Sequence, residues 1–184
     1  MKTLVILSHP NMANSLANKT IIDELSNNKG ITIRHLDKLY SGYSIDVVAE
    51  QNALVAADTI VLQFPFYWYS TPASLKNWID QVFTFNFAYG PEGDKLKGKN
   101  LIVSITVGGP QDAYTPLGYN HFSIAEFLKP LEQTATLTQM RWNPPVFTHG
   151  CVYIPGGDNI KEEVEARVHE HTQRLLQQLE ILSK

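Results

Sequence analysis

Residues 58–83 read DTIVLQFPFYWYSTPASLKNWIDQVF, and they join a buried strand to an amphipathic helix through an aromatic loop. The first seven, 58–64, are continuously apolar enough to predict a strand buried on both faces. Thr71-Pro72 then predicts a helix start, with proline at the first helical position. The apolar residues that follow recur with the spacing of one helical face: Leu75, Trp78, Ile79, Val82 and Phe83. A strand leading directly into such a helix indicates one unit of a parallel α/β sheet.

Strands and helices alternate along the rest of the chain. Apolar patterning predicts further strands at 2–7, 31–36 and 101–106 and within 146–153, and helices at about 17–26, 46–57, 123–133 and 160–182. This alternation favours an α/β fold whose parallel sheet is covered by helices on both faces, with right-handed crossovers. Five strands favour the flavodoxin-like order 2-1-3-4-5 over the Rossmann order, which normally has six strands.

The composition limits the classes of protein to consider. A chain of 184 residues with 43% hydrophobic and 18% charged residues suits a single globular domain spanning 1–184. The net charge of −3, without a tract of Lys or Arg, argues against a nucleic-acid partner. The apolar run Leu4–Leu7 is too short for membrane insertion or for a signal sequence. The single cysteine, Cys151, suits a reducing compartment, so we expect a cytoplasmic protein.

Ligands of such sheets bind beyond the carboxyl ends of the strands, so loops 8–15, 65–71 and 106–121 should form the site. The first loop precedes a helix N-terminus, where free amides and the helix dipole favour an anion. Asn14 or Ser15 can cap this helix, Ser15 and Asn18 can turn toward a phosphate, and His9 can donate to it. The alternative is an ordinary capped helix with a surface histidine. Neither the dinucleotide nor the P-loop glycine fingerprint is present.

The second loop holds the aromatic run Phe-Pro-Phe-Tyr-Trp-Tyr at 64–69. Core packing is one explanation, but side chains alternate along a strand, so these residues cannot all point inward. Tyr67 and Tyr69 also carry hydroxyls that need partners when buried. A flat ligand and a subunit interface remain as two further explanations.

The third loop begins at Gly108-Gly109, which can let a ligand approach the backbone, and it goes on to Tyr114 and His121. Taken alone, each of these two donors could be an ordinary surface residue; their place beside the expected cleft favours a role in the site. Three features at one sheet edge predict FMN as the cofactor: a helix N-terminus that can bind a phosphate, the aromatic residues of 65–69 (called the aromatic wall below), and the turn at Gly108-Gly109. The ring system would lie by Pro65, Phe66, Tyr67, Trp68 and Tyr69. A metal is not expected, because a flavin carries its own redox chemistry.

Several segments resemble the flavodoxin-fold NAD(P)H:quinone oxidoreductases over nearly the whole chain. They are SHP at 8–10, S-x-A-N within 15–18, residues 45–83, FAYG at 87–90, LKGK at 96–99 and TVGG at 106–109. In length and pattern the chain is most similar to the small quinone oxidoreductases that are ancillary subunits of glutathione-gated potassium-efflux systems.

The resemblance implies which residues contact the flavin. His9, Ser15, Leu16, Ala17 and Asn18 would hold the phosphate end, and residues 66–69 would lie along the ring. Thr106, Val107, Gly108 and Gly109 would surround its polar edge, and Tyr114 and His121 would assist hydride transfer. Three departures from the family concern specificity: Val107 replaces a common Thr, Tyr67 replaces a common Gln, and Pro110-Gln-Asp replaces a smaller turn rich in Gly and Ser. The spacing from Tyr114 to His121 is one residue longer than in the mammalian enzyme, so the resemblance supports His121 less strongly than Tyr114.

The implied activity is two-electron, ping-pong transfer from NAD(P)H through FMN to a quinone, in a homodimer whose site lies at the subunit interface. FMN is favoured over FAD because the chain lacks the C-terminal extension of the mammalian FAD enzyme. Two other functions stay open: a regulatory flavoprotein subunit of a potassium-efflux transporter, and a flavodoxin-type electron carrier. The sequence leaves the choice between NADH and NADPH, and the native acceptor, undecided.

Overall fold

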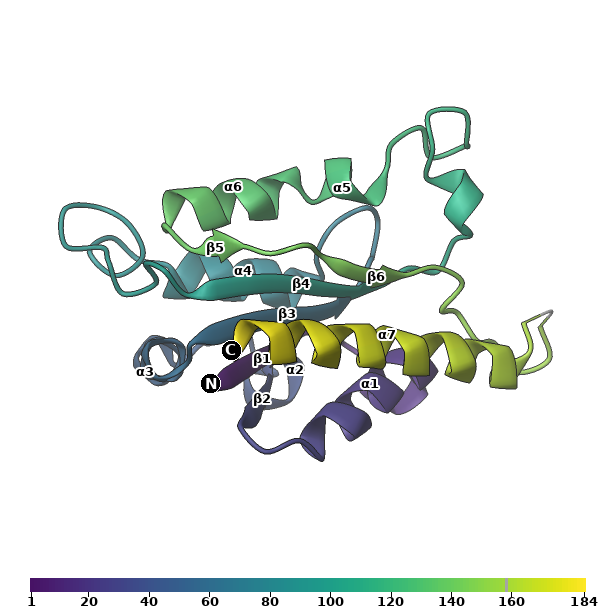
Figure 1. Ribbon diagram of the computed structural model, residues 1–184, viewed down its shortest axis with the longest axis horizontal. Helices are drawn as coiled ribbons and strands as arrows, with labels where there is room; N and C mark the ends of the chain where they lie inside the picture. Colours follow the sequence, from purple (N-terminus) through teal and green to yellow (C-terminus); the bar gives the residue numbers. More distant parts are fainter. Residues whose placement is uncertain (158) are drawn as a thin grey trace.

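A computed structural model describes residues 1–157 and 159–184 as a parallel sheet between two layers of helices (Figure 1). The strands are β1 (Thr3–Leu7), β2 (Ile31–His35), β3 (Thr59–Pro65), β4 (Asn100–Thr106), β5 (Arg141–Trp142) and β6 (Val146–Thr148). The α-helices are α1 (Leu16–Ser26), α2 (Leu36–Leu39), α3 (Val47–Ala56), α4 (Ala73–Val82), α5 (Ile124–Phe127), α6 (Lys129–Leu137) and α7 (Lys161–Leu182). Two short 3₁₀ turns are η1 (Met12–Asn14) and η2 (Gln111–Ala113).

The sheet has the order β2-β1-β3-β4-β5, and every pairing is parallel. This confirms the predicted flavodoxin-like arrangement. The strand expected within 146–153 is present as β6, and β5 is a further short strand that the sequence did not predict; both pair with β4, and residues 143–145 separate them. Pro144 and Pro145 have no amide hydrogen to give to a ladder, so strand pairing stops there and resumes at Val146.

Each face of the sheet is buried under a different set of helices, and alternate strand residues point to opposite faces. Val5, Val61 and Ile102 face α1 and α7, which lie side by side below the sheet in Figure 1. Ile6, Leu62 and Val103 belong to the other core, with side chains from α3, α4 and α6. Within the described part of the chain, no helix combines the length and the apolar character needed to cross a bilayer.

Three sequence-based boundaries need correction. Pro72 is the N-cap of α4 and not its first residue, so the helix begins one residue later than expected. Leu36 begins α2 instead of ending β2. The helix expected at 123–133 is two helices that meet at Leu128, and Pro130, which lacks an amide hydrogen, stands in the first turn of the second.

The carboxylate of Glu50 is the centre of a buried polar cluster that joins β2, α3 and α4. Its residue is fully buried, and its oxygens accept hydrogen bonds from Arg34 Nε (2.7 Å), the Tyr40 hydroxyl (2.6 Å) and Trp78 Nε1 (2.9 Å). A buried charge is tolerated only when it is paired and hydrogen-bonded, and Glu50 meets both conditions. The cluster therefore fixes the α3 and α4 layer against the edge strand.

We expect Glu50→Ala to lower the free energy of unfolding by about 3 kcal/mol, because it leaves the partly buried Arg34 without its carboxylate. Asp80→Ala is the matched control, since the ion pair between Asp80 and Lys76 is exposed on both sides and should contribute less than about 1 kcal/mol. Urea unfolding of the two variants measures the difference. Equal losses of stability would contradict the role given to the buried cluster.

Candidate functional site

A cleft of about 370 Å³ opens at the carboxyl ends of β1, β3 and β4, where the sequence predicted it. Four segments line it: the loop and helix start after β1, the loop after β3, the end of β4, and the segment after β6. The lining residues are His9, Asn11, Asn14, Ser15, Leu16, Ala17, Asn18, Pro65, Phe66, Tyr67, Thr106, Gly108, Cys151, Val152 and Tyr153.

Most of the predicted cofactor-binding residues lie together in this lining, but four do not. Trp68, Tyr69, Val107 and Gly109 stand outside it. Asn11 and Asn14 lie in the predicted loop 8–15 but were not named as contacts to a cofactor, and the sequence analysis missed residues 151–153. The signal for 151–153 was available, because a segment that follows the fifth strand also leaves the sheet at its carboxyl edge.

The N-terminus of α1 presents hydrogen-bond donors that suit an anion. Ser15 is the N-cap, and its oxygen accepts from the backbone amide of Asn18 (3.2 Å). The side-chain amide of Asn18 donates to the same Ser15 oxygen (3.3 Å) and to Thr106 Oγ1 (3.0 Å). Because both hydroxyl oxygens already accept, their hydrogens are left to donate toward the cleft. The free amides of the first helical turn add to this positive end.

His9 presents a neutral ring beside the same helix end. Its Nδ1 accepts from the amide of Asn11 (3.0 Å), so Nε2 carries the ring hydrogen. Burial lowers the pKa of His9, while the nearby carboxylate of Asp37 opposes this in part. Asp37 also accepts from the backbone amide of His9 (2.8 Å) and from the Ser74 hydroxyl (3.0 Å), which anchors the loop. The site thus gains a fixed N–H donor.

The aromatic run divides between core and surface, as the alternation argument predicted. Phe64 and Phe66 are buried, whereas Tyr67 and Tyr69 are 43% exposed and Trp68 is 91% exposed. Trp68 and Tyr69 also adopt left-handed backbone angles, with φ of 47° and 63°, which are costly for large side chains. They form a tight reversal in which the amide of Ser70 donates to the carbonyl of Tyr67 (3.0 Å). Core packing therefore explains only part of the run.

The ring of Tyr114 packs against Phe66, and His149 is the histidine next to Tyr114. The Tyr114 ring lies 6.2 Å from Phe66 and 5.2 Å from His149, centroid to centroid. Burial raises the pKa of the Tyr114 hydroxyl, so it stays protonated at neutral pH. His149 Nδ1 donates to the carbonyl of Gly109 (3.3 Å), and burial lowers its pKa.

His121 is exposed, with a left-handed φ of 61°. Its backbone amide donates to the carbonyl of Gly118 (3.0 Å), but its side chain makes no hydrogen bond or ring contact with any other residue in the described ranges. Its neighbour Asn120 is partly buried, and the Asn120 side-chain oxygen accepts from the Tyr69 hydroxyl (2.9 Å). The structure therefore does not bring His121 and Tyr114 together, and the role of His121 stays a prediction.

The two glycines after β4 are close to other side chains as well as to the cleft. A Cβ at Gly108 would lie 2.8 Å from Val152 Cγ2, and one at Gly109 would lie 3.2 Å from Tyr114 Cε2. Close packing by 152 and 114 therefore accounts for small residues here, in addition to the approach of a ligand that the sequence suggested. Among the residues described, no cluster of three or more His, Cys, Asp or Glu could hold a metal ion.

The profile of a family described by its flavodoxin-like fold matches residues 1–177. The chain belongs to this family. A glutathione-regulated potassium-efflux system ancillary protein from Enterobacter sp. (strain 638) is 40% identical to it over 173 residues, which are 94% of each chain. Among solved structures, general stress protein 14 of Treponema denticola in complex with FMN is 34% identical, with a TM-score of 0.86 over 95% of this chain and 98% of that one. An NADPH-quinone reductase from P. pentosaceus is 30% identical, with a TM-score of 0.81 over 95% and 97%.

Cys151 lines the cleft in this flavodoxin-like chain, and its burial raises the pKa of the thiol to about 11. We expect alkylation by iodoacetamide at pH 8 to run about 100-fold slower than for an exposed thiol, because two pKa units remove that much thiolate. Mass spectrometry of timed samples measures the rate, and the urea-unfolded chain is the control. A folded-state rate equal to the unfolded one would contradict this environment.

Proposed function

We propose that this protein is a flavin-dependent NAD(P)H:quinone oxidoreductase that binds FMN in the cleft. The observation that carries the proposal is the joining of two surfaces in one cavity: the donor-rich start of α1 and the aromatic wall of Phe66 and Tyr67. FMN has a phosphate for the first and a flat ring for the second. The names of the quinone reductase and of the FMN-bound relative support the same assignment.

The residues present fit FMN at both ends. Ser15 through Asn18 and His9 would hold the phosphate through amides, hydroxyls and the His9 N–H. Pro65 through Tyr69 would lie along the ring system, and Thr106 through Gly109 would face its polar edge. When bound, FMN supplies the hydride chemistry, which a ping-pong exchange of NAD(P)H and quinone at one open face would use.

In this proposal Tyr114 and His121 assist hydride transfer by stabilising the negative charge that develops on the flavin. The Tyr114 hydroxyl is protonated at neutral pH because burial raises its pKa, and it would donate a hydrogen bond to a bound flavin where negative charge develops. His121 would reach the same region from the exposed part of the loop after β4. The protein's contribution is therefore to orient and to stabilise charge, without a nucleophile of its own.

We further propose a cytoplasmic homodimer whose partner subunit closes over the open side of the cleft. The support is a group of exposed apolar side chains on the loops beside it: Trp68, Leu117, Tyr119 and Phe122. Large exposed aromatic residues are favoured in the centre of protein interfaces. This arrangement would combine the ligand and interface explanations of the aromatic run.

The experiment compares two N-cap variants. Ser15→Ala and Asp46→Ala each remove one cap hydrogen bond, and each should cost about 1 kcal/mol of stability. Only Ser15→Ala also removes a donor to the phosphate, so it should weaken FMN binding about tenfold. Fluorescence titration measures the affinity, and oxidation of NAD(P)H with menadione measures the activity of the FMN-loaded protein. Equal FMN affinity in the two variants, or no menadione-dependent oxidation, would overturn the proposal.

A second candidate is regulation of a potassium-efflux transporter. The relative named as an ancillary protein of such a system covers 94% of this chain at 40% identity, which is the observation in its favour. Co-purification of the FMN-loaded protein with the transporter from its own organism tests this role. A stable complex is expected under this proposal, and its absence at micromolar concentration would leave a free-standing reductase.

A further inference from the structure

A second cavity, of about 430 Å³, lies beside the cleft and shares the side chain of Tyr67 with it. It is bounded by α2 and the loop that follows it, by the loop after β3, and by the start of α4. We call it the Tyr67 pocket. Its volume falls within the range of about 300–1,000 Å³ that is usual for small-molecule sites. Because the two cavities have a common wall, one long ligand can occupy both.

Three exposed aromatic side chains line the Tyr67 pocket: Tyr43, Tyr67 and Trp68. Trp68 also belongs to the proposed contact with the partner subunit, whereas Tyr43 and Tyr67 do not. These two tyrosines are therefore the rings available to a ligand. Aromatic side chains of this kind pack well against another flat ring.

Tyr43 is held firmly at the edge of the pocket. Its backbone is left-handed, with φ of 60°, a conformation that is costly for a large side chain. Its amide donates to the Tyr40 carbonyl (2.9 Å), and its carbonyl accepts from Asn77 Nδ2 (3.1 Å) and Gln81 Nε2 (3.3 Å) of α4. Backbone strain of this kind is concentrated at ligand-binding and other functional sites. The loop after α2 thus fixes a tyrosine at the pocket.

Asp37 is the one charged side chain among the described residues that line the Tyr67 pocket. Its Oδ2 accepts from the backbone amide of His9 (2.8 Å) and from the Ser74 hydroxyl (3.0 Å), and its Oδ1 takes part in neither bond. Burial raises the pKa of the Tyr67 hydroxyl, and the negative charge of Asp37 raises it further, so the field of Asp37 reaches into the pocket. Oδ1 is therefore a charged acceptor for a ligand hydroxyl.

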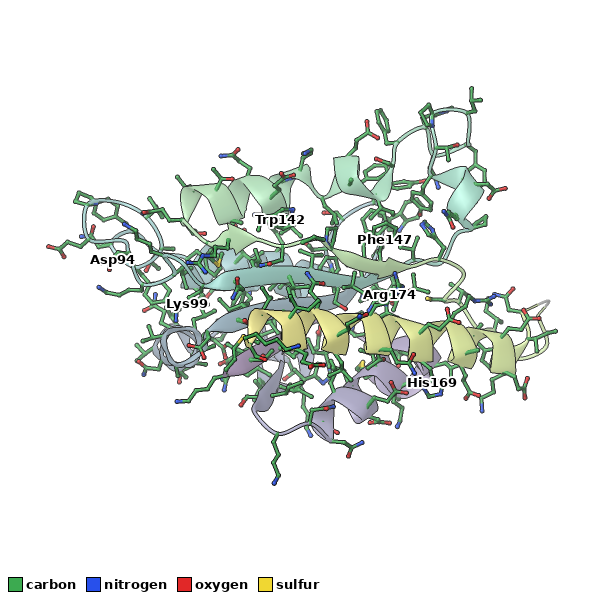
Figure 2. The ribbon with its side chains drawn as sticks, in the orientation of Figure 1. Asp94, Lys99, Trp142, Phe147, His169 and Arg174 are labelled. Atoms are coloured by element: carbon green, nitrogen blue, oxygen red, sulfur yellow. The ribbon has the colours of Figure 1, made fainter. Side chains whose placement is uncertain are left out.

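The start of α4 does not make the pocket a phosphate site. A helix N-terminus attracts negative charge, but Asp37 already supplies it, because Ser74 in the first turn of α4 donates to its carboxylate. Lys38, the neighbour of Asp37 in sequence, does not line the pocket. Of the basic residues labelled in Figure 2, Lys99 directly precedes β4 at the opposite edge of the sheet, and Arg174 of α7 bonds to β6. A phosphate here would face a carboxylate, and no basic side chain in the described lining would pair with it.

NAD(P)H matches the two cavities when its nicotinamide half lies in the cleft and its adenosine half lies in the Tyr67 pocket. Adenine is flat and can pack on Tyr43 and Tyr67, and the ribose hydroxyls can donate to Asp37 Oδ1. NADPH differs from NADH only by a phosphate on that ribose, at the 2′ position. In dinucleotide-binding folds an acidic residue at the ribose 2′-hydroxyl suits NAD, whereas a nearby arginine accommodates the 2′-phosphate of NADP.

We propose that the Tyr67 pocket binds the adenosine half of the electron donor, and that Asp37 makes NADH the preferred donor over NADPH. The inference rests on the proposed function, because it assigns a place to the donor of that reaction. The selecting force is repulsion between the Asp37 carboxylate and the 2′-phosphate, which are both negative at neutral pH. Tyr43 contributes equally to the binding of the two donors, since both contain adenine.

Calorimetric titration of the FMN-loaded protein with adenosine and with adenosine 2′-phosphate tests the pocket without any turnover. Adenosine should bind about tenfold more tightly, and Tyr43→Leu should weaken both ligands to the same extent. Asp37→Asn keeps an acceptor for His9 and Ser74 but removes the charge, so it should reduce the difference to about threefold or less. No binding of adenosine at millimolar concentration, equal affinities in the wild type, or adenosine binding unchanged in Tyr43→Leu would overturn the inference.

The consequence for the reaction is the ratio of kcat/KM for NADH to that for NADPH, with menadione as the acceptor. This ratio should be about ten in the wild type and close to one in Asp37→Asn. Asp46→Asn is the matched control, because Asp46 also stands at a helix N-terminus but lines neither cavity, and it should leave the ratio unchanged. A ratio that stays the same in Asp37→Asn would overturn the inference.

Arg167 offers the contrasting arrangement. It lines a different cavity, which borders the cleft at Gly108, and a guanidinium is suited to a 2′-phosphate. A wild-type preference for NADPH would overturn the inference, and its loss in Arg167→Gln would place the donor in that other cavity. A wild-type protein that holds no FMN would refute the proposed function instead. Adenosine titration of that protein would still test the pocket, because adenosine has no phosphate to bind at the start of α1.

Discussion

Parallel pairing of β1 with β2 on one side and β3 on the other is the constraint on which the rest of the structure depends. Because every strand runs the same way, each connection must cross a face of the sheet, and both faces become buried under helices. The connection after β1 leads to β2 on one side and the connection after β3 leads to β4 on the other, so the loops after β1 and β3 separate at the carboxyl edge. The cleft is the space that this divergence creates, and α1 begins at its border.

Burial on both faces makes any polar group in the sheet region costly, and the molecule uses such groups differently on its two sides. On one face, the carboxylate of Glu50 joins three elements and remains remote from the cleft. On the other, Gln63, Ser104 and His171 occupy strand and helix positions that a purely apolar core could fill. Gln63 donates to Asn18, which contacts the hydroxyls of Ser15 and Thr106 in the cleft, whereas Ser104 and His171 form a separate buried pair.

The sequence was enough to predict the sheet order and the place of the cleft, because strand periodicity, helix caps (Asp46, and Asn14 or Ser15) and the switch-point rule are local or topological properties. The sequence was not enough to predict every residue near the cleft, because some contacts depend on segments far apart in the chain. Residues 151–153 were within reach of the switch-point rule, because they follow the last strand, but the rule was applied only to the loops after the first, third and fourth strands. His121 has a left-handed backbone and an exposed side chain, while its neighbour Asn120 accepts from the Tyr69 hydroxyl, and no spacing rule anticipates this one-residue difference. Gln63 looked like an ordinary member of a buried strand until its partners on other elements were known.

The interruption of the outer strand at Pro144 and Pro145 has a consequence for solubility. A sheet edge with a continuous row of free amides and carbonyls can pair with the edge of another molecule, which is how many β-structures aggregate. Here the outer edge has two residues in β5 and three in β6, and neither proline between them can donate to a neighbouring chain. The two prolines therefore keep this side of the sheet closed to growth by strand addition, while both flanking strands remain paired with β4.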